Sequence, residues 1–224
     1  MFRTTTALAG ALSLLLPPNP ALAAEEDANI WLAQTATVDL GGSIVLWLEA
    51  QERLTDDASR LGQLLVRPAI GYRIDPTTTA YLGYAYVMTD PTGPVRTHEH
   101  RIFQQLSFRL LGDGKGVTLT GRTRLEQRRL EGRDGTGWRM RQQLRLSAPL
   151  SGKVRAIAWT EPFVGLNETT FQRGGLGLWR NFAGVAIPAG KTFTIEPGYL
   201  NQYVVRTGRD RLDHTASLPL NASF

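Results

Sequence analysis

The residues best suited to chemistry in this chain are His98, Glu99 and His100, which can bind a metal ion or act as a base. A hydrolase would pair such a histidine with a serine nucleophile, and no serine lies near this segment. His214 and Ser217 are three positions apart, so on a strand their side chains would point to opposite faces. The sequence has no glycine-rich phosphate loop, zinc-ligand spacing or calcium loop. We therefore predict no catalytic residues, metal site or cofactor, and interpret the histidines as rim residues.

A second candidate feature is a ladder of charges between residues 98 and 146, where charged side chains recur at every second position in three runs. The charged positions are Glu99, Arg101, Arg109, Arg122, Arg124, Glu126, Arg128, Arg139, Arg141 and Arg145. Mostly apolar residues occupy the alternate positions, and this period of two is typical of β-strands with two unlike faces. The glutamates could include a general acid or base, but we interpret them as counter-ions to the arginines. This set is Glu49, Glu99, Glu126, Glu161 and Glu196.

Such strands fit two environments. In a soluble sandwich the apolar faces form the core, whereas in a transmembrane barrel they face lipid and the charges line the interior. The amino end favours export, because residues 1–24 combine Arg3, an apolar run over residues 7–16 and Ala21-Leu22-Ala23, the pattern of a cleaved secretory signal peptide. Export argues against nucleic acid as a partner despite the net charge of +5. Residues 25–224 have the length of one domain, without cysteine or an apolar run long enough for a transmembrane helix.

Eleven strand-like segments can be identified along this domain. They span residues 29–40, 43–53, 62–74, 78–88, 98–110, 117–128, 138–147, 154–166, 176–187, 192–205 and 213–224. Short connections alternate with longer, more polar ones, as in outer-membrane barrels. The predicted fold class is therefore all-β, an antiparallel up-and-down transmembrane β-barrel of ten to twelve strands. Because bacterial barrels usually have even strand numbers, the first and last strands pair in parallel, or the first lies outside the wall, or the count is off.

The carboxyl end supports this fold. Ala216, Leu218, Leu220, Ala222 and Phe224 form an apolar face that ends on a terminal aromatic residue, which resembles the signal by which outer-membrane barrels are recognised for assembly. We therefore expect the bacterial outer membrane as the location, with outer-membrane lipid and the barrel assembly machinery as partners. Most large aromatic residues are expected at the membrane interfaces. They are Trp31, Trp47, Trp138, Trp159, Trp179, Tyr72, Tyr81, Tyr199 and Tyr203.

The cost of charge in lipid determines which face points inward. One arginine on the lipid face near the midplane costs about 2–4 kcal/mol, so the eight arginines of the ladder must line the interior. Like charges directly opposite each other are unfavourable, so the predicted register places Arg101 opposite Glu126 and Glu99 opposite Arg128. Because arginines outnumber inward glutamates, we expect a positive, hydrated lumen in which Glu126 bridges at least two arginines.

Several short motifs carry a resemblance. They are His98-Glu99-His100-Arg101, the Arg-Thr-Arg-Leu-Glu-Gln-Arg run at residues 122–128, the inward Glu49 and Arg53, Arg180-Asn181, and Gly198-Tyr199. Together they resemble a bacterial family, domain of unknown function 2490, which is regarded as outer-membrane-barrel-like. The resemblance covers nearly all of residues 25–224. It implies an outer-membrane barrel and brings no catalytic residues, because none are established for the family.

Three functions remain open. The preferred one is a non-enzymatic outer-membrane barrel whose polar lumen binds or passes small anions or is a salt-bridged plug. The alternatives are a lipid-modifying outer-membrane enzyme with a site at the rim, and a soluble periplasmic barrel that binds a ligand. The predicted lumen network consists of Glu49, Arg53, Glu99, Arg101, Arg122, Arg124, Glu126, Arg128, Arg139, Arg141, Arg145, Arg180 and Glu196.

Overall fold

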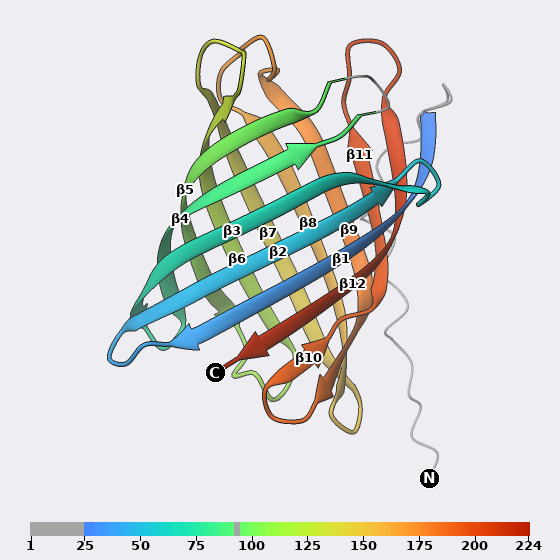
Figure 1. Ribbon diagram of the computed structural model, residues 1–224. Helices are drawn as coiled ribbons and strands as arrows, with labels where there is room; N and C mark the ends of the chain where they lie inside the picture. Colours follow the sequence, from blue (N-terminus) through green and yellow to red (C-terminus); the bar gives the residue numbers. More distant parts are fainter. Residues whose placement is uncertain (1–24, 92–94) are drawn as a thin grey trace.

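A computed structural model describes residues 25–91 and 95–224, so the expected signal peptide at residues 1–24 lies outside the described residues. The described residues form twelve β-strands (Figure 1). They are β1 (Glu25–Asp39), β2 (Ile44–Thr55), β3 (Arg60–Asp75), β4 (Thr78–Thr89), β5 (Thr97–Leu111), β6 (Thr118–Leu130), β7 (Gly137–Ser151), β8 (Val154–Gly165), β9 (Gly175–Ala189), β10 (Phe193–Ile195), β11 (Gly198–Val204) and β12 (Arg211–Ser223). No helix in these ranges is long and apolar enough to cross a membrane.

The strands close into a single β-barrel. From β1 to β9 each strand pairs antiparallel with the next. β9 then pairs with both β10 and β11, and both of these pair with β12, so the two short strands share one position in the wall. The barrel closes where β12 lies parallel to β1, from Glu25 opposite Arg211 to Thr37 opposite Ser223. Figure 1 shows these two strands side by side, running in the same direction.

The predicted all-β barrel and its strand number are confirmed, with one difference in detail. The segment predicted as one strand over residues 192–205 is divided into β10 and β11 at Glu196-Pro197. Pro197 has no N–H to donate to a neighbouring strand, so one ladder hydrogen bond is missing at this point. Because β10 and β11 share one place in the wall, the barrel has an odd number of strand positions. Such a barrel can close because β1 and β12 pair in parallel.

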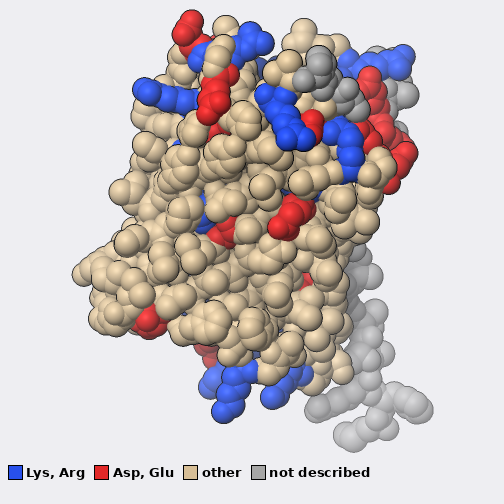
Figure 2. Space-filling view, viewed as in Figure 1, with Lys and Arg blue, Asp and Glu red and all other residues tan. Residues whose placement is uncertain are grey.

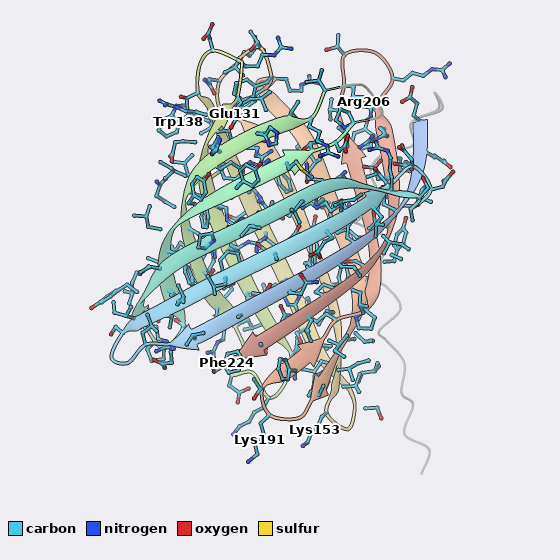
Figure 3. The ribbon with its side chains drawn as sticks, viewed as in Figure 1. Glu131, Trp138, Lys153, Lys191, Arg206 and Phe224 are labelled. Atoms are coloured by element: carbon cyan, nitrogen blue, oxygen red, sulfur yellow. The ribbon has the colours of Figure 1, made fainter. Side chains whose placement is uncertain are left out.

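The two ends of the barrel differ in their connections. The turns at one end are short, such as Pro76-Thr77 after β3 and Gly152-Lys153 after β7, whereas the connection after β8 spans residues 166–174. Figure 3 shows Lys153 and Lys191 at the short-turn end with Phe224, and Glu131 and Arg206 at the other. The terminal residue is held in the wall, because its N–H donates to the Thr37 carbonyl at 2.9 Å.

Alternate residues of each strand face opposite sides of the wall. On β5, Glu99, Arg101 and Phe103 are buried inside, while Ile102 between them is 54% exposed. Figure 2 shows the same separation on the surface, with uncharged residues over most of the barrel side and charged residues gathered mainly at its two ends. The fold therefore places polar groups inside and apolar groups outside.

Candidate functional site

The centre of the barrel holds a chain of ion pairs that begins at Glu126 on β6. This carboxylate is 1% exposed and accepts hydrogen bonds from Arg139 Nε at 2.8 Å and from Arg141 Nη1 at 2.9 Å. Both arginines lie on β7 at inward positions, so the alternation of the two strands brings the three side chains together. The prediction that Glu126 bridges at least two arginines is confirmed.

Arg141 connects Glu126 to a second buried carboxylate, Glu161 on β8. Its Nη2 lies 2.9 Å from Glu161 Oε2, and Arg122 Nη2 lies 2.8 Å from Oε1 of the same residue. The guanidinium of Arg141 also lies 4.2 Å from the centroid of the Phe163 ring. Positive and negative groups therefore alternate across β6, β7 and β8, and charge-assisted hydrogen bonds of this kind are the strong ones.

The predicted register between β5 and β6 is wrong by two residues. Arg101 lies opposite Arg128, and Glu126 lies opposite Phe103. The like charges are tolerated because Glu99 accepts hydrogen bonds from both, at 2.7 Å from Arg101 Nη2 and 2.6 Å from Arg128 Nε. Long side chains reach diagonal neighbours in a sheet, so ion pairing does not require direct opposition.

The connection between β8 and β9 covers the barrel mouth above this cluster. Gln172 in this connection is 8% exposed. Its Oε1 accepts a hydrogen bond from Arg128 Nη1 at 3.1 Å, and its Nε2 donates to the Trp138 carbonyl at 2.8 Å. The charge network thus also anchors a loop.

Three interior arginines bind glutamine in place of glutamate. The pairs are Arg53–Gln63 at 2.6 Å, Arg124–Gln105 at 2.8 Å and Arg180–Gln202 at 2.8 Å. Aromatic rings cover the same guanidinium groups, with Arg124 lying 4.5 Å from the Phe103 centroid. Amide oxygens and ring faces both attract cations, which explains how the interior holds more arginines than carboxylates. The predicted hydration does not extend to Arg124, which is 0% exposed.

Two further ion pairs complete the network. Arg67 on β3 pairs with Glu49 on β2, and Arg145 Nη2 lies 2.7 Å from Glu196 Oε1. All the predicted network residues take part in the contacts described above. The predicted set lacks Arg67 and Asp213, although both occupy inward parity, and it lacks the glutamine acceptors. The alternation of inward and outward positions along β3 and β12 would have identified Arg67 and Asp213. Nothing in the sequence distinguishes a glutamine that binds arginine from one that does not.

Three tryptophans expected at the membrane interfaces, Trp31, Trp47 and Trp159, point into the barrel instead. Trp31 is 8% exposed, and the Trp159 ring stacks on Phe182 with centroids 5.4 Å apart. Trp31 belongs to an apolar core with Ile157, Phe182, Ala186 and Leu200, and Trp159 packs against it. Wide aromatic rings fill a barrel interior that the short arginine–glutamate contacts alone would leave open. Trp138 and Trp179 remain on the outside, 41% and 36% exposed.

Side chains close the interior at mid-height. Arg124, Phe103, Leu65, Glu126 and Glu161 are all less than 2% exposed. Gly83 provides room for this packing, because a Cβ at that position would lie 2.2 Å from Phe103 Cζ. The arrangement fixes charges in a tightly filled interior, where each central carboxylate is already engaged by arginines.

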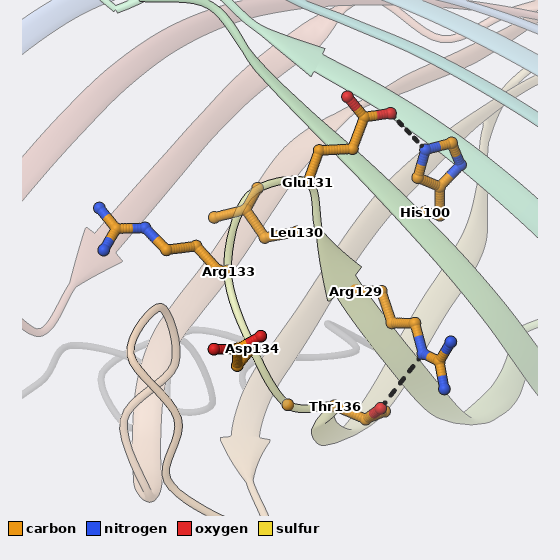
Figure 4. Close-up of a pocket in the computed structure, with 8 residues that line it drawn as sticks. His100, Arg129, Leu130, Glu131, Arg133, Asp134 and Thr136 are labelled. Atoms are coloured by element: carbon orange, nitrogen blue, oxygen red, sulfur yellow. Dashed lines mark hydrogen bonds and ion pairs between the residues drawn. The ribbon is translucent and has the colours of Figure 1, made fainter.

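The three histidines lie on the outer face of the wall, each hydrogen-bonded through Nδ1 to a tyrosine on a neighbouring strand. The pairs are Tyr84–His100, Tyr86–His98 and Tyr199–His214, each at 2.6 Å. His100 Nε2 also lies 2.8 Å from Glu131 in a hollow of about 290 Å³ at the rim (Figure 4). Arg133 and Asp134 line the same hollow but extend away from His100. Within residues 25–91 and 95–224, no serine hydroxyl is bonded to a histidine, so these residues do not form a nucleophile–base pair.

Comparison with protein families identifies the family of this chain. The profile of the family described as "Protein of unknown function (DUF2490)" matches residues 28–213. The chain belongs to the DUF2490 family. An uncharacterized protein of Methylorubrum extorquens is 37% identical to it over 228 residues, which cover 98% of each chain. No solved structure matches the chain. The family resemblance predicted from the sequence is confirmed, and it assigns no activity.

Proposed function

We propose that this DUF2490 protein is an integral outer-membrane barrel with a closed, ion-paired interior and no catalytic activity. The observation that carries the proposal is the inverted polarity of the barrel, which has charged side chains inside and apolar side chains outside. Arg124, Glu126 and Glu161 are buried inside, while thirty large apolar side chains of residues 25–91 and 95–224 are exposed, Leu82 at 60% and Ile70 at 56% among them. Soluble monomers rarely expose apolar patches of more than a few hundred Å², whereas lipid stabilises such a belt.

The arrangement of the ends gives the proposed orientation. Outer-membrane barrels have short periplasmic turns and longer outer loops, so the end with Phe224 faces the periplasm. Strands of 12 to 16 residues surround most of the wall, which exceeds the 9 to 11 residues that a tilted strand needs to cross the bilayer. The tyrosine–histidine pairs on the outer face then lie toward the outer interface, where amphipathic rings are favoured.

Fractionation tests the location. We expect the mature protein in the outer-membrane fraction, requiring detergent for extraction and migrating faster on gels before boiling than after, because a closed barrel resists unfolding by detergent alone. Recovery in the soluble periplasmic fraction without detergent would contradict the proposal and favour the soluble ligand-binding barrel.

Bilayer conductance tests the closed interior against the anion-channel alternative. We expect no conductance steps from the refolded wild-type protein, since the central side chains leave no path at mid-height. Replacing both Phe103 and Arg124 with alanine would remove two of the most buried interior side chains and should produce measurable steps. Steady anion-selective conductance of the wild type would show that the interior opens, and the proposal of a closed core would be wrong.

Deleting Phe224 tests the proposed partnership with the assembly machinery. Phe224 is 65% exposed and its ring lies 6.4 Å from that of Phe193, so the deletion removes little buried side-chain surface, together with the backbone hydrogen bonds to Thr37 and Asp39. We expect the deletion to reduce outer-membrane levels several-fold, while Ser223→Ala, which changes an adjacent polar residue, leaves them unchanged. Equal levels of the two variants would count against an assembly signal at Phe224.

A further inference from the structure

The outer face of the wall is not equally apolar all the way round the barrel. On five neighbouring strands, β5 to β9, an outward polar side chain lies within two residues of the middle of the strand. These side chains, which we call the polar band, belong to Gln104, Thr123, Gln142, Thr160 and Asn181. The outward residues at the same level of β2 and β3 are apolar, namely Leu48, Ala50, Val66 and Pro68. Figure 1 shows β2 and β3 in the near wall and β6 to β9 in the far wall.

The polar band faces away from the interior network. Gln104, for example, is exposed, whereas its neighbours Phe103 and Gln105 are 1% and 8% exposed on the inside. In the outer-membrane placement proposed above, on which this inference rests, the middle of each strand lies among lipid tails. Lipid tails neither donate nor accept hydrogen bonds, so polar groups at this level need partners from protein.

The polar band satisfies itself only in part. Thr123 Oγ1 donates to Gln142 Oε1 at 2.5 Å, and Thr160 Oγ1 donates to Asn181 Oδ1 at 2.8 Å. Gln104 exchanges two hydrogen bonds with Gln127 on β6, at 3.3 Å and 2.9 Å. These contacts use the amide oxygens, and each oxygen can accept a second hydrogen bond.

The amide nitrogens have donors to spare. Each amide NH₂ group carries two N–H donors. Gln104 Nε2 donates once, to Gln127, and Gln142 Nε2 donates once, to the Gln143 carbonyl. Asn181 Nδ2 donates to no group in residues 25–91 and 95–224. All three amides of the polar band therefore retain at least one N–H that a neighbouring protein surface could bind.

We propose that the outer face of β5 to β9 is the contact surface for a second copy of this chain in the membrane. Two copies inserted in the same direction are related by a two-fold axis along the membrane normal, which brings the two polar bands to the same height. Amides donate and accept, so identical polar bands can satisfy each other. Amide and hydroxyl side chains link membrane-spanning segments in this way.

The composition and size of this face fit a second copy. The polar band contains no charged side chain, so it does not require an acidic or basic partner. Five strands about 4.8 Å apart within an apolar belt about 25 Å tall offer roughly 600 Å². Two such faces together offer about 1,200 Å², the lower end of the range for stable protein–protein interfaces.

Cross-linking tests the contact, because the chain has no cysteine and a single introduced cysteine can react only with another molecule. Gln142 lies on β7, the middle strand of the five, and is therefore expected near the two-fold axis. In isolated outer membranes we expect Gln142→Cys to give a covalent dimer, by oxidation or with a short bismaleimide, at least tenfold more than Val66→Cys. Equal yields at the two positions, no dimer at either, or an adduct of another mass would overturn the proposal.

Substitution of the amides tests their role. Replacing both Gln142 and Asn181 with leucine should raise the dimer dissociation constant in micelles at least tenfold, measured by sedimentation. Heat-dependent gel migration should be retained, because leucine suits a lipid-facing position. Gln34→Leu is the matched control, since Gln34 is an outward amide on β1 that donates to Glu52 at 3.2 Å, and it should leave the dissociation constant unchanged.

The outcomes separate this inference from the proposed location. Wild-type protein that fractionates with the outer membrane but sediments as a monomer would refute the second copy and leave the membrane placement standing. Loss of the dimer in Gln34→Leu but not in the double variant would move the contact to β1 and β2 and overturn the assignment. Recovery of the mature protein in the soluble fraction would overturn both proposals.

Discussion

Replacing Glu126 with glutamine should lower the free energy of unfolding by about 3–5 kcal/mol, because it removes one partner of a buried ion pair. Arg139 and Arg141 both donate to this carboxylate, and Arg124 Nη1 lies 3.9 Å from it. Glutamine keeps the shape and one acceptor but not the charge, so three guanidinium groups would remain close together with less compensation. The urea midpoint of unfolding of the refolded protein in micelles measures the change.

Gln127→Glu is the matched comparison for this substitution. Gln127 is the next residue on β6 but faces outward, where its side chain donates to Gln104 at 2.9 Å. A carboxylate at an outward position near the interface costs less than an unpaired charge inside, so this variant should lower the midpoint by a smaller amount. An unchanged midpoint for Glu126→Gln would show that Glu126 is not the centre of the network.

Replacing Leu82 with arginine should destabilise the barrel by about 2–4 kcal/mol when it is folded in a bilayer. Leu82 is 60% exposed and lies in the middle part of the wall, opposite Ile70 on β3. In the proposed orientation its side chain contacts lipid tails, where an arginine has no partner. Unfolding in urea from phospholipid bilayers, followed by tryptophan fluorescence, measures the effect.

Ile74→Arg controls for the substitution itself. Ile74 is 57% exposed, nearly the same fraction as Leu82, but it lies at the end of β3 beside a short turn. Near the interface the cost of arginine falls to about 0–1 kcal/mol, so the two variants should differ clearly. If both were tolerated equally, the apolar belt would not be in contact with lipid, and the membrane proposal would fail.

The strands, their two faces and the alternation of short and long connections could be predicted from the amino-acid pattern alone. Each of these follows from local order along the chain, because successive side chains on a strand point to opposite sides. The positions of Arg122, Arg124 and Glu126 on one parity are sufficient to place them on the same face of β6. The cost of charge in an apolar environment then determined which face is inside.

The register and the partners within that interior could not be predicted and became apparent in the three-dimensional structure. Arg101 can lie opposite Arg128 because Glu99 accepts from both, from Arg101 on its own strand and from Arg128 on the neighbouring strand. The same holds for Arg124, which Gln105 and Phe103 accommodate without a directly hydrogen-bonded carboxylate. Period-two patterns are unchanged when one strand slides by two residues, so a pattern cannot distinguish these registers.

The closure of the barrel also follows only from the three-dimensional structure. β1 and β12 come from opposite ends of the chain, and their parallel pairing sets Asn29 opposite Thr215 and Asp27 opposite Asp213. The sequence places Thr215 on the polar face of the last strand, but it predicted no facing for Asp27 or Asn29. Which of them meet, and which buried atoms are left without a partner, depends on how the whole wall closes, because contacts between distant strands are set by the packing of all the strands between them.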